Sequence, residues 1–261
     1  MSCGSRARFF VFGLVSVVAV GCAKDDEPAG STDEFKINEL SASFGVGIDA
    51  STLTVRAALL KGGFLRVGDG DKVTIDVGGK EVSTYERVDG GRVHTIAEVK
   101  PPPAGRTEIV VTFTRGDERV VAKTLIAPPF ELVDAPTSAK RGEAVKIDLS
   151  PRPDLEPWKG PLGPSLRHGV IVRGECVEKG EQKVEGCGAD SPAGQCTQGY
   201  PFTFDTSKLK LTTESDCDVD VEVQLQTNGG PFVGEGPAKE AFSGGAFNAV
   251  QHRAFKLRLA R

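Results

Sequence analysis

Short β-branched runs separated by glycine-containing turns dominate the sequence from residue 35 onward. Gly78-Gly79, Gly90-Gly91 and Gly116-Asp117 each lie between two runs that alternate apolar and polar residues. Two-residue turns of this kind join neighbouring antiparallel strands, because glycine adopts the positive φ that such a tight turn requires. No segment shows convincing helical periodicity. The pattern therefore predicts an all-β fold and argues against a parallel α/β sheet.

Turn spacing and proline position suggest how the chain is divided. Strands at intervals of about 8–12 residues between 35 and 127 are typical of a β-sandwich. Ala127-Pro128-Pro129 then predicts a semi-rigid joint, and Phe130–Ser150 resembles the opening two strands of bacterial Ig-like modules. We therefore predict two tandem antiparallel β-sandwich domains, 35–127 and 128–261, with an Ig-like or fibronectin-like architecture.

The N-terminus has the features of an export signal. Arg6 and Arg8 precede an apolar run over residues 9–20, which is too short for a membrane-spanning helix of about 20 residues but fits a secretory signal. The run ends in Ala19-Val20-Gly21-Cys22, which resembles the lipobox of bacterial lipoproteins. The resemblance implies that residues 1–21 are a signal peptide and that Cys22 carries lipid. An ordinary signal-peptidase site also fits, and it too cuts before Cys22.

The cysteine count favours lipidation. Five cysteines follow residue 21, and an odd thiol in an exported protein needs an explanation. Lipid on Cys22 leaves an even four. The resemblance then implies a bacterial cell-envelope protein bound to a membrane through its lipid. Ala23, rather than Asp, follows the lipidated residue and favours the outer membrane.

The region after Cys22 is polar. Residues 23–33 have almost no apolar content, so we predict a disordered tether over 22–34 that could lift the body up to ~40 Å from the bilayer. The whole chain has 32 basic and 36 acidic residues and a net charge of −4. That balance offers no basic footprint for nucleic acid.

The four remaining cysteines all lie in the second half of the chain. Their spacing contains no C-x₂₋₄-C pair of the kind that binds zinc, and export favours disulfides. We predict a Cys176–Cys217 bridge between strands, because one residue follows a strand-like run and the other precedes one. We predict a second bridge, Cys187–Cys196, because both residues lie among glycines and prolines that indicate a loop.

Alternating acids mark the segment Asp216–Glu222. A β-strand here directs Asp216, Asp218, Asp220 and Glu222 to one face. Clustered carboxylates suit calcium, but a straight row is poorly shaped for that ion. The alternative is a solvated face on which Lys208 and Lys210 of a neighbouring strand pair with the acids. We favour the lysine-paired face and predict no metal site.

The motifs of common enzyme classes are absent from the sequence. Gly45–Ala50 matches a GxGxxA string, but the residues after it predict a strand, whereas a dinucleotide fingerprint requires a helix. The chain has no GxSxG, Walker or HExxH motif. His94, His168 and His252 are isolated, so we assign them structural roles and expect no cofactor.

The best candidates for ligand contact are the aromatic residues Trp158, Tyr200 and Phe202, which lie near loops. We expect them first to fill the edge of the sandwich core and second to bind a ligand. Together these features predict a lipid-anchored cell-envelope protein that acts as a non-catalytic binding or interaction module for an envelope protein or glycan. The alternatives are a structural component of an envelope complex and a hydrolase with an unrecognised site.

Overall fold

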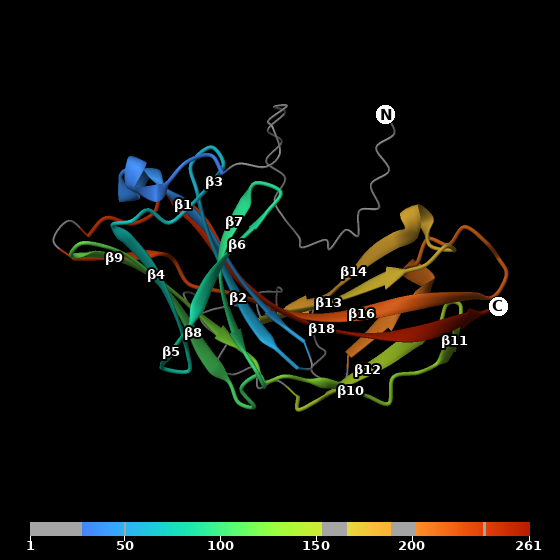
Figure 1. Cartoon of the computed structure of the whole chain (residues 1–261). Coiled ribbons are helices and arrows are strands. Elements are labelled where there is room, and N and C mark those ends of the chain that lie inside the picture. The colour runs from blue at the N-terminus through green and yellow to red at the C-terminus, as the bar shows by residue number, and fades with distance from the viewer. Residues whose placement is uncertain (1–27, 50, 153–165, 189–201, 237–238) are drawn as a thin grey trace, which may run out of the picture.

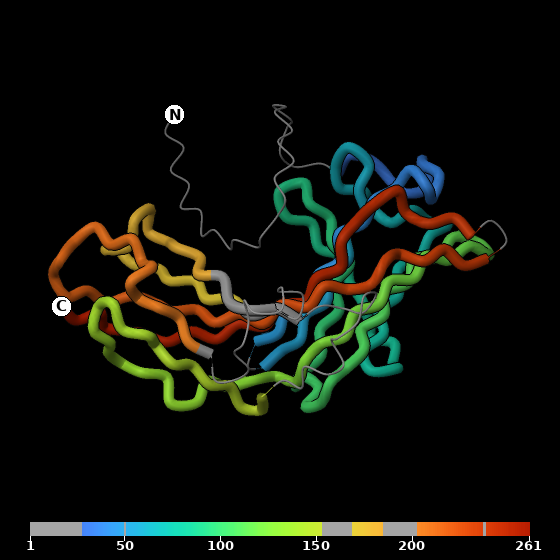
Figure 2. The backbone as a smooth tube through the Cα atoms, turned by 180° about the vertical axis from the view of Figure 1, so that it is seen from behind, coloured from blue at the N-terminus to red at the C-terminus, as the bar shows by residue number. Residues whose placement is uncertain are grey.

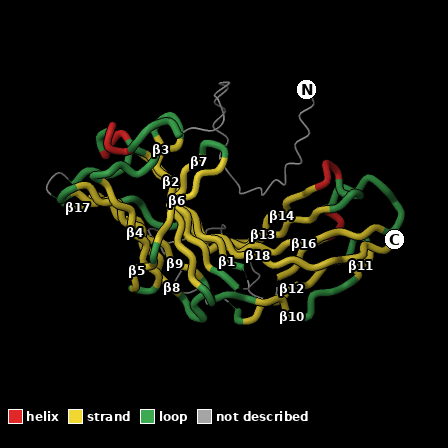
Figure 3. Tube along the Cα trace, in the orientation of Figure 1, coloured by secondary structure: helices red, strands yellow, loops and turns green. Residues whose placement is uncertain are grey.

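The computed structural model describes residues 28–49, 51–152, 166–188, 202–236 and 239–261 (Figure 1). Within these ranges the secondary structure consists of β-strands and of three-residue 3₁₀ turns. No helix in the described ranges is long and apolar enough to span a bilayer. The predicted all-β class is confirmed (Figure 3).

The described strands form three sheets. The largest has ten strands: β1 (Ser41–Ile48), β2 (Leu53–Leu60), β3 (Phe64–Leu65), β6 (Thr84–Asp89), β7 (Arg92–Val99), β11 (Ser138–Lys140), β13 (Leu166–Arg173), β14 (Glu181–Gly188), β16 (Cys217–Asn228) and β18 (Gly244–Ala260). Their order is β14-β13-β16-β18-β1-β2-β7-β6, with β3 beside β2 and β11 beside β18.

The two smaller sheets pack on the large one. One contains β4 (Asp71–Val77), β5 (Lys80–Val82), β8 (Thr107–Arg115), β9 (Glu118–Ile126) and β17 (Val233–Glu235). The other contains β10 (Glu131–Val133), β12 (Ala144–Ser150) and β15 (Phe202–Asp205). The described 3₁₀ turns are η1 (Thr32–Glu34), η2 (Ile37–Glu39), η4 (Glu178–Gly180) and η5 (Thr206–Lys208).

Two hydrophobic cores lie under one face of the ten-stranded sheet. The first is shared with the five-stranded sheet, and its largest fully buried side chains include Phe44, Ile75, Ile109 and Phe113. The second is shared with the three-stranded sheet and includes Phe130, Ile147, Val221 and Leu257. The architecture is therefore a β-sandwich arrangement in which one long sheet serves two cores.

The three hairpins predicted from the turn sequences are confirmed. Their closing pairs are Val77↔Lys80, Asp89↔Arg92 and Arg115↔Glu118. Gly90 and Gly91 adopt φ values of 55° and 72°, which a side chain would strain.

Strand β18 joins the two cores (Figure 2). Its first half pairs in parallel with β1, from Ser41↔Gly244 to Ile48↔Gln251, and it pairs antiparallel with β16. Phe247 belongs to the first core and Leu257 to the second. We expected only antiparallel pairing and a strand over residues 254–259. The strand is longer because burial of Phe247 against the first core outweighs the weak β propensity of the glycines before it.

The segment before β18 also returns to the first core. Phe232, Phe242 and Phe247 surround Phe44, with ring centroids at 5.3, 6.4 and 5.7 Å and near-perpendicular planes. Residues that we grouped with 128–261 therefore complete the core of the first sandwich. Turn signals could not indicate this return, because the contacts join residues almost 200 positions apart.

A buried glutamine holds the connection between the cores. Gln251 is only 3% exposed, and its side-chain Nε2 donates to the carbonyl oxygens of Ala127 and Pro128 at 2.7 and 3.3 Å. The predicted joint is therefore hydrogen-bonded to the strand that both cores share.

Residues 29–34, which we assigned to the tether, pack against the first sandwich instead. The Ala29 amide donates to the carbonyl oxygen of Phe64 at 2.9 Å, and Thr32 is fully buried. The Thr32 hydroxyl contacts Asp71 Oδ2 and accepts from the Gly68 amide at 2.9 Å. Composition missed this docking because the stabilising groups are polar and come from distant strands.

Candidate functional site

The ten-stranded sheet has a second face, on the side away from the cores, which we call the outer face. Gly45 and Gly47 of β1 lie near its middle, and a Cβ added to either would meet no atom within 4 Å. Polar side chains on both sides of them are exposed; examples are Ser43, Arg56, Asp218, Asp220, Lys256 and Arg258. The outer face therefore carries exposed polar side chains in both sandwiches and continues from one to the other, although Ile96 and Ile171 on it are buried.

The acidic row lies on this face, but its partners differ from our prediction. In β16, Asp218 and Asp220 lie opposite Arg258 and Lys256 of β18. Lys208 belongs to the 3₁₀ turn η5, so the predicted hairpin that placed Lys208 and Lys210 beside the acids is wrong. The solvated, cation-paired character of the row holds, because β18 supplies the cations.

The ends of the acidic row are engaged in ion pairs. Glu222 lies 2.5 Å from Arg173, and Asp216 lies 3.2 Å from Arg258. Burial opposes ionisation of Glu222, but hydrogen bonds from Gln224 and Arg173 outweigh it and lower the pKa of this carboxyl. The Arg261 amide and Arg258 lower the pKa of Asp216. Among the described residues, no group of three or more His, Cys, Asp or Glu side chains is placed to hold a metal ion.

The first-sandwich half of the outer face carries a different charge arrangement. Three exposed arginines, Arg56, Arg87 and Arg92, surround His94; we call these three arginines the basic cluster. Burial lowers the pKa of His94, and the positive charges of Arg56 and Arg92 lower it further. The histidine thus marks a region of positive potential within an acidic protein.

Two aromatic rings border the basic cluster. Phe64 of β3 packs edge-on against His94, with ring centroids 5.6 Å apart. Tyr85 of β6 lies opposite Ile96, remains 48% exposed and donates its hydroxyl to Glu98 at 3.2 Å.

Sequence reasoning missed the basic cluster. Its arginines come from β2, β6 and β7, and their common face becomes visible only when the strand order is known. Alternation along residues 53–60 places Arg56 on the same face as Thr54 and Ala58, but it does not say which strands lie beside that face.

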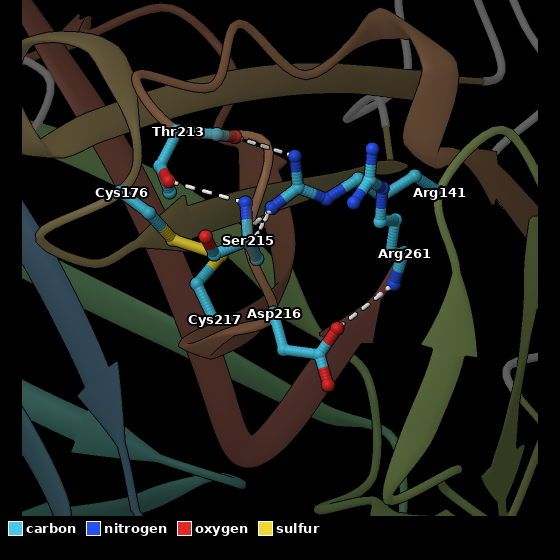
Figure 4. Close-up of a disulfide and its surroundings, with 7 residues drawn as sticks. All are labelled: Arg141, Cys176, Thr213, Ser215, Asp216, Cys217 and Arg261. Atoms are coloured by element: carbon cyan, nitrogen blue, oxygen red, sulfur yellow. Dashed lines mark hydrogen bonds between the residues drawn. A yellow bond between two sulfur atoms is a disulfide. The ribbon is translucent and has the colours of Figure 1, made fainter.

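The predicted Cys176–Cys217 disulfide is confirmed (Figure 4). It ties the start of β16 to the turn that follows β13. Arg141 reinforces the same corner by donating to the backbone carbonyls of Thr213 and Ser215. This corner lies at the far end of the second sandwich, beside the C-terminus.

The second predicted bridge, Cys187–Cys196, involves a residue outside the described ranges. Cys187 itself lies in strand β14, where we expected a loop. Glycines on both sides suggested coil, but pairing of β14 with β13, through Arg167↔Gly188, continues the strand past them.

Of the three predicted aromatic candidates, the structure describes only Phe202. Trp158 and Tyr200 lie outside the described residues, as does Cys22. Phe202 begins β15 and lies opposite Ile147 of β12. The three histidines occupy β7, β13 and β18, and β1 is followed by strand β2 rather than by the helix that a dinucleotide fingerprint needs.

No protein-family model matches the sequence, and no curated protein matches it.

Proposed function

We propose that this chain is a lipid-anchored protein of the bacterial cell envelope that acts as a non-catalytic binding module. The observation that carries the proposal is the outer face of the ten-stranded sheet, which β18 makes continuous across two cores. An open sheet face supported by two cores is a rigid surface for contact with a large partner. Its partner would be an envelope protein or a glycan.

The anchor in this proposal is lipid on Cys22, after removal of residues 1–21. The basic n-region, the short apolar run and the Ala19–Cys22 string support it. The Cys176–Cys217 disulfide agrees with an exported, oxidising location. We place the protein at the outer membrane on the basis of Ala23, and we describe its two modules as Ig-like sandwiches that share a strand.

The test is cross-linking in cells followed by capture of the tagged full-length chain. A Gly47→Arg variant obstructs the outer face at a position where a side chain meets open space. Thr112→Arg, on β8 of the opposite sheet, is the matched control. We expect one partner that is enriched with the unchanged and Thr112→Arg chains and lost with Gly47→Arg.

A second variant, Cys22→Ser, tests the anchor in the same cells. We expect the Cys22→Ser protein to be absent from the membrane fraction. It should then fail to capture the partner, because it is no longer held at the same membrane. The absence of any specific partner, or a partner that is indifferent to Gly47→Arg, would contradict the binding-module proposal.

A structural role within an envelope complex is the second candidate. The hydrogen bonds from Gln251 to the joint between the cores favour this role, because a rigid connection would hold the two sandwiches in a fixed arrangement within a larger complex. A stoichiometric complex that survives gentle detergent extraction would distinguish this role from reversible binding.

A further inference from the structure

We propose that the basic cluster, Arg56, Arg87 and Arg92, binds the phosphate-bearing headgroups of the bilayer that holds the lipid on Cys22. This inference rests on the proposed lipid anchor, and it adds a second contact with the same membrane. The occupant is therefore an anionic phospholipid surface.

The strand register places the three arginines on one patch. Arg87 lies directly opposite His94, and Arg92 lies two residues before His94 on the same strand face. Arg56 lies opposite Ile96, on the other side of β7, and is therefore a diagonal neighbour of His94. Opposite residues in such a sheet have Cβ atoms about 4.5–5.5 Å apart, and diagonal ones about 7–8 Å. All three guanidinium groups thus reach one surface.

Neighbouring carboxylates neutralise the charge of this patch only in part. No ion pair or side-chain hydrogen bond engages Arg56, Arg87 or Arg92 within the described part of the chain. Asp89, opposite Arg92, is the one carboxylate that the register places beside them without an ion pair in the described structure. The other nearby acid, Glu98, forms an ion pair with Lys100, with 3.1 Å between Glu98 Oε2 and Lys100 Nζ. The patch therefore keeps a positive excess.

The other half of the outer face behaves differently. There Arg173 lies between Glu181 and Glu222, and Arg258 pairs with Asp216. Lys256 lies opposite Asp220. The excess of cations over carboxylates is thus found at the β6 end of the ten-stranded sheet. This asymmetry gives the protein one side that is complementary to an anionic surface, despite its overall negative charge.

The position of the anchor selects a membrane as the occupant. The Ala29 amide donates to the Phe64 carbonyl, and the Phe64 ring packs on His94 at the centre of the cluster. The first described residues of the chain therefore lie beside the arginines. The seven peptide links between Cys22 and Ala29 span at most about 25 Å, so lipid on Cys22 holds the patch close to the headgroups.

Tyr85 adds a feature that suits the headgroup region. It shares a row with Ile96 and Arg56 across the sheet, and about half of its side chain is exposed. Tyrosine is favoured at membrane interfaces because its ring is apolar and its hydroxyl is polar.

The experiment uses the mature chain, residues 22–261, with Cys22→Ser and an N-terminal hexahistidine tag. Vesicles with a nickel-chelating lipid hold it at their surface, with either phosphatidylglycerol or only phosphatidylcholine as the bulk lipid. Amide hydrogen exchange is then measured by mass spectrometry. We expect slower exchange in β6 and β7 on the phosphatidylglycerol vesicles alone, and loss of this protection at high salt.

Charge variants identify the residues responsible. We expect each single substitution to weaken binding to the phosphatidylglycerol surface by about fivefold; the substitutions are Arg56→Gln, Arg87→Gln and Arg92→Gln. The triple variant should lose the slower hydrogen exchange in β6 and β7. The matched control removes three exposed cations from other surfaces, namely Arg106, Arg119 and Lys146, and is expected to keep it.

Two results would overturn the inference. One is equal protection on both kinds of vesicle or in the triple variant. The other is protection of β6 and β7 by a soluble acidic polysaccharide but not by the anionic vesicles, which would identify a glycan as the ligand. The chelating lipid replaces the natural anchor in this experiment. A negative result therefore counts against membrane binding by the basic cluster, and it does not bear on whether Cys22 carries lipid.

Discussion

Arg115 on β8 lies 2.5 Å from Asp71 on β4, and the carboxylate of Asp71 is fully buried. The same guanidinium donates to the backbone carbonyls of Phe35 and Thr32 at 2.6 Å. Hydrogen bonds from Arg115 and Thr32 offset the burial of this carboxylate. The hydrogen bonds to Asp71 raise the pKa of Arg115. The pair therefore fixes the point at which the polypeptide enters the first sandwich.

Replacing Arg115 tests this entry point. Arg115→Ala leaves the Asp71 carboxylate buried without its ion pair, and we expect a loss of about 3–5 kcal/mol in the free energy of unfolding. Urea denaturation measures the loss. Arg119→Ala, at an exposed position of β9, is the control and should change stability by no more than about 0.5 kcal/mol. Equal effects of the two substitutions would show that the buried pair is not important.

The disulfide gives a second prediction. The double substitution Cys176→Ala with Cys217→Ala should lower the free energy of unfolding by about 2–4 kcal/mol, since the bridge closes a loop across 41 positions. A peptide map without reductant should contain these two cysteines in one linked peptide. Linkage of either to a different cysteine would contradict the structure.

The environment of His94 predicts a dependence of stability on pH. Burial and the nearby arginines lower its pKa in the folded state below the value of about 6.5 for an unfolded chain. The unfolded chain therefore binds a proton more readily below about pH 6.5, and stability falls as the pH falls through that value. His94→Gln should remove this part of the loss in melts at pH 7.5 and 5, and Arg56→Gln should reduce it. An unchanged pH profile in His94→Gln would refute the assignment.

The acidic row predicts indifference to calcium. Asp216 and Glu222 are engaged by arginines, and the carboxylates lie along a straight strand, unlike the curved loops that bind this ion. We expect the same unfolding temperature in millimolar calcium and in a chelator. A saturable rise with calcium that disappears in Asp218→Asn would contradict this expectation.

Local features of the fold were predictable from sequence. The hairpin turns at Gly78, Gly90 and Gly116 depend on residues adjacent in the chain, so their glycines indicate both the turn and its register. The same holds for alternation in β16, which identifies its acidic and buried faces correctly.

Apart from the Cys176–Cys217 bridge, contacts between distant segments were not predictable. The parallel pairing of β1 with β18 joins the first and last strands, and no local signal specifies it. Thr32 lies in a segment whose polar composition predicts a tether. Its hydroxyl is nevertheless buried and contacts the carboxylate of Asp71 and the amide of Gly68, which come from another part of the chain. The basic cluster depends in the same way on strand order, so single-strand patterns could not reveal it.

The most direct test of the lipid anchor is mass spectrometry of the native protein extracted from membranes of its source cells. The account predicts a mature N-terminal peptide that begins at Cys22 and carries thioether-linked diacylglycerol. An N-terminal peptide that begins at Cys22 with a free thiol, or one that retains residues before position 22, would contradict the anchor and the functional proposal built on it.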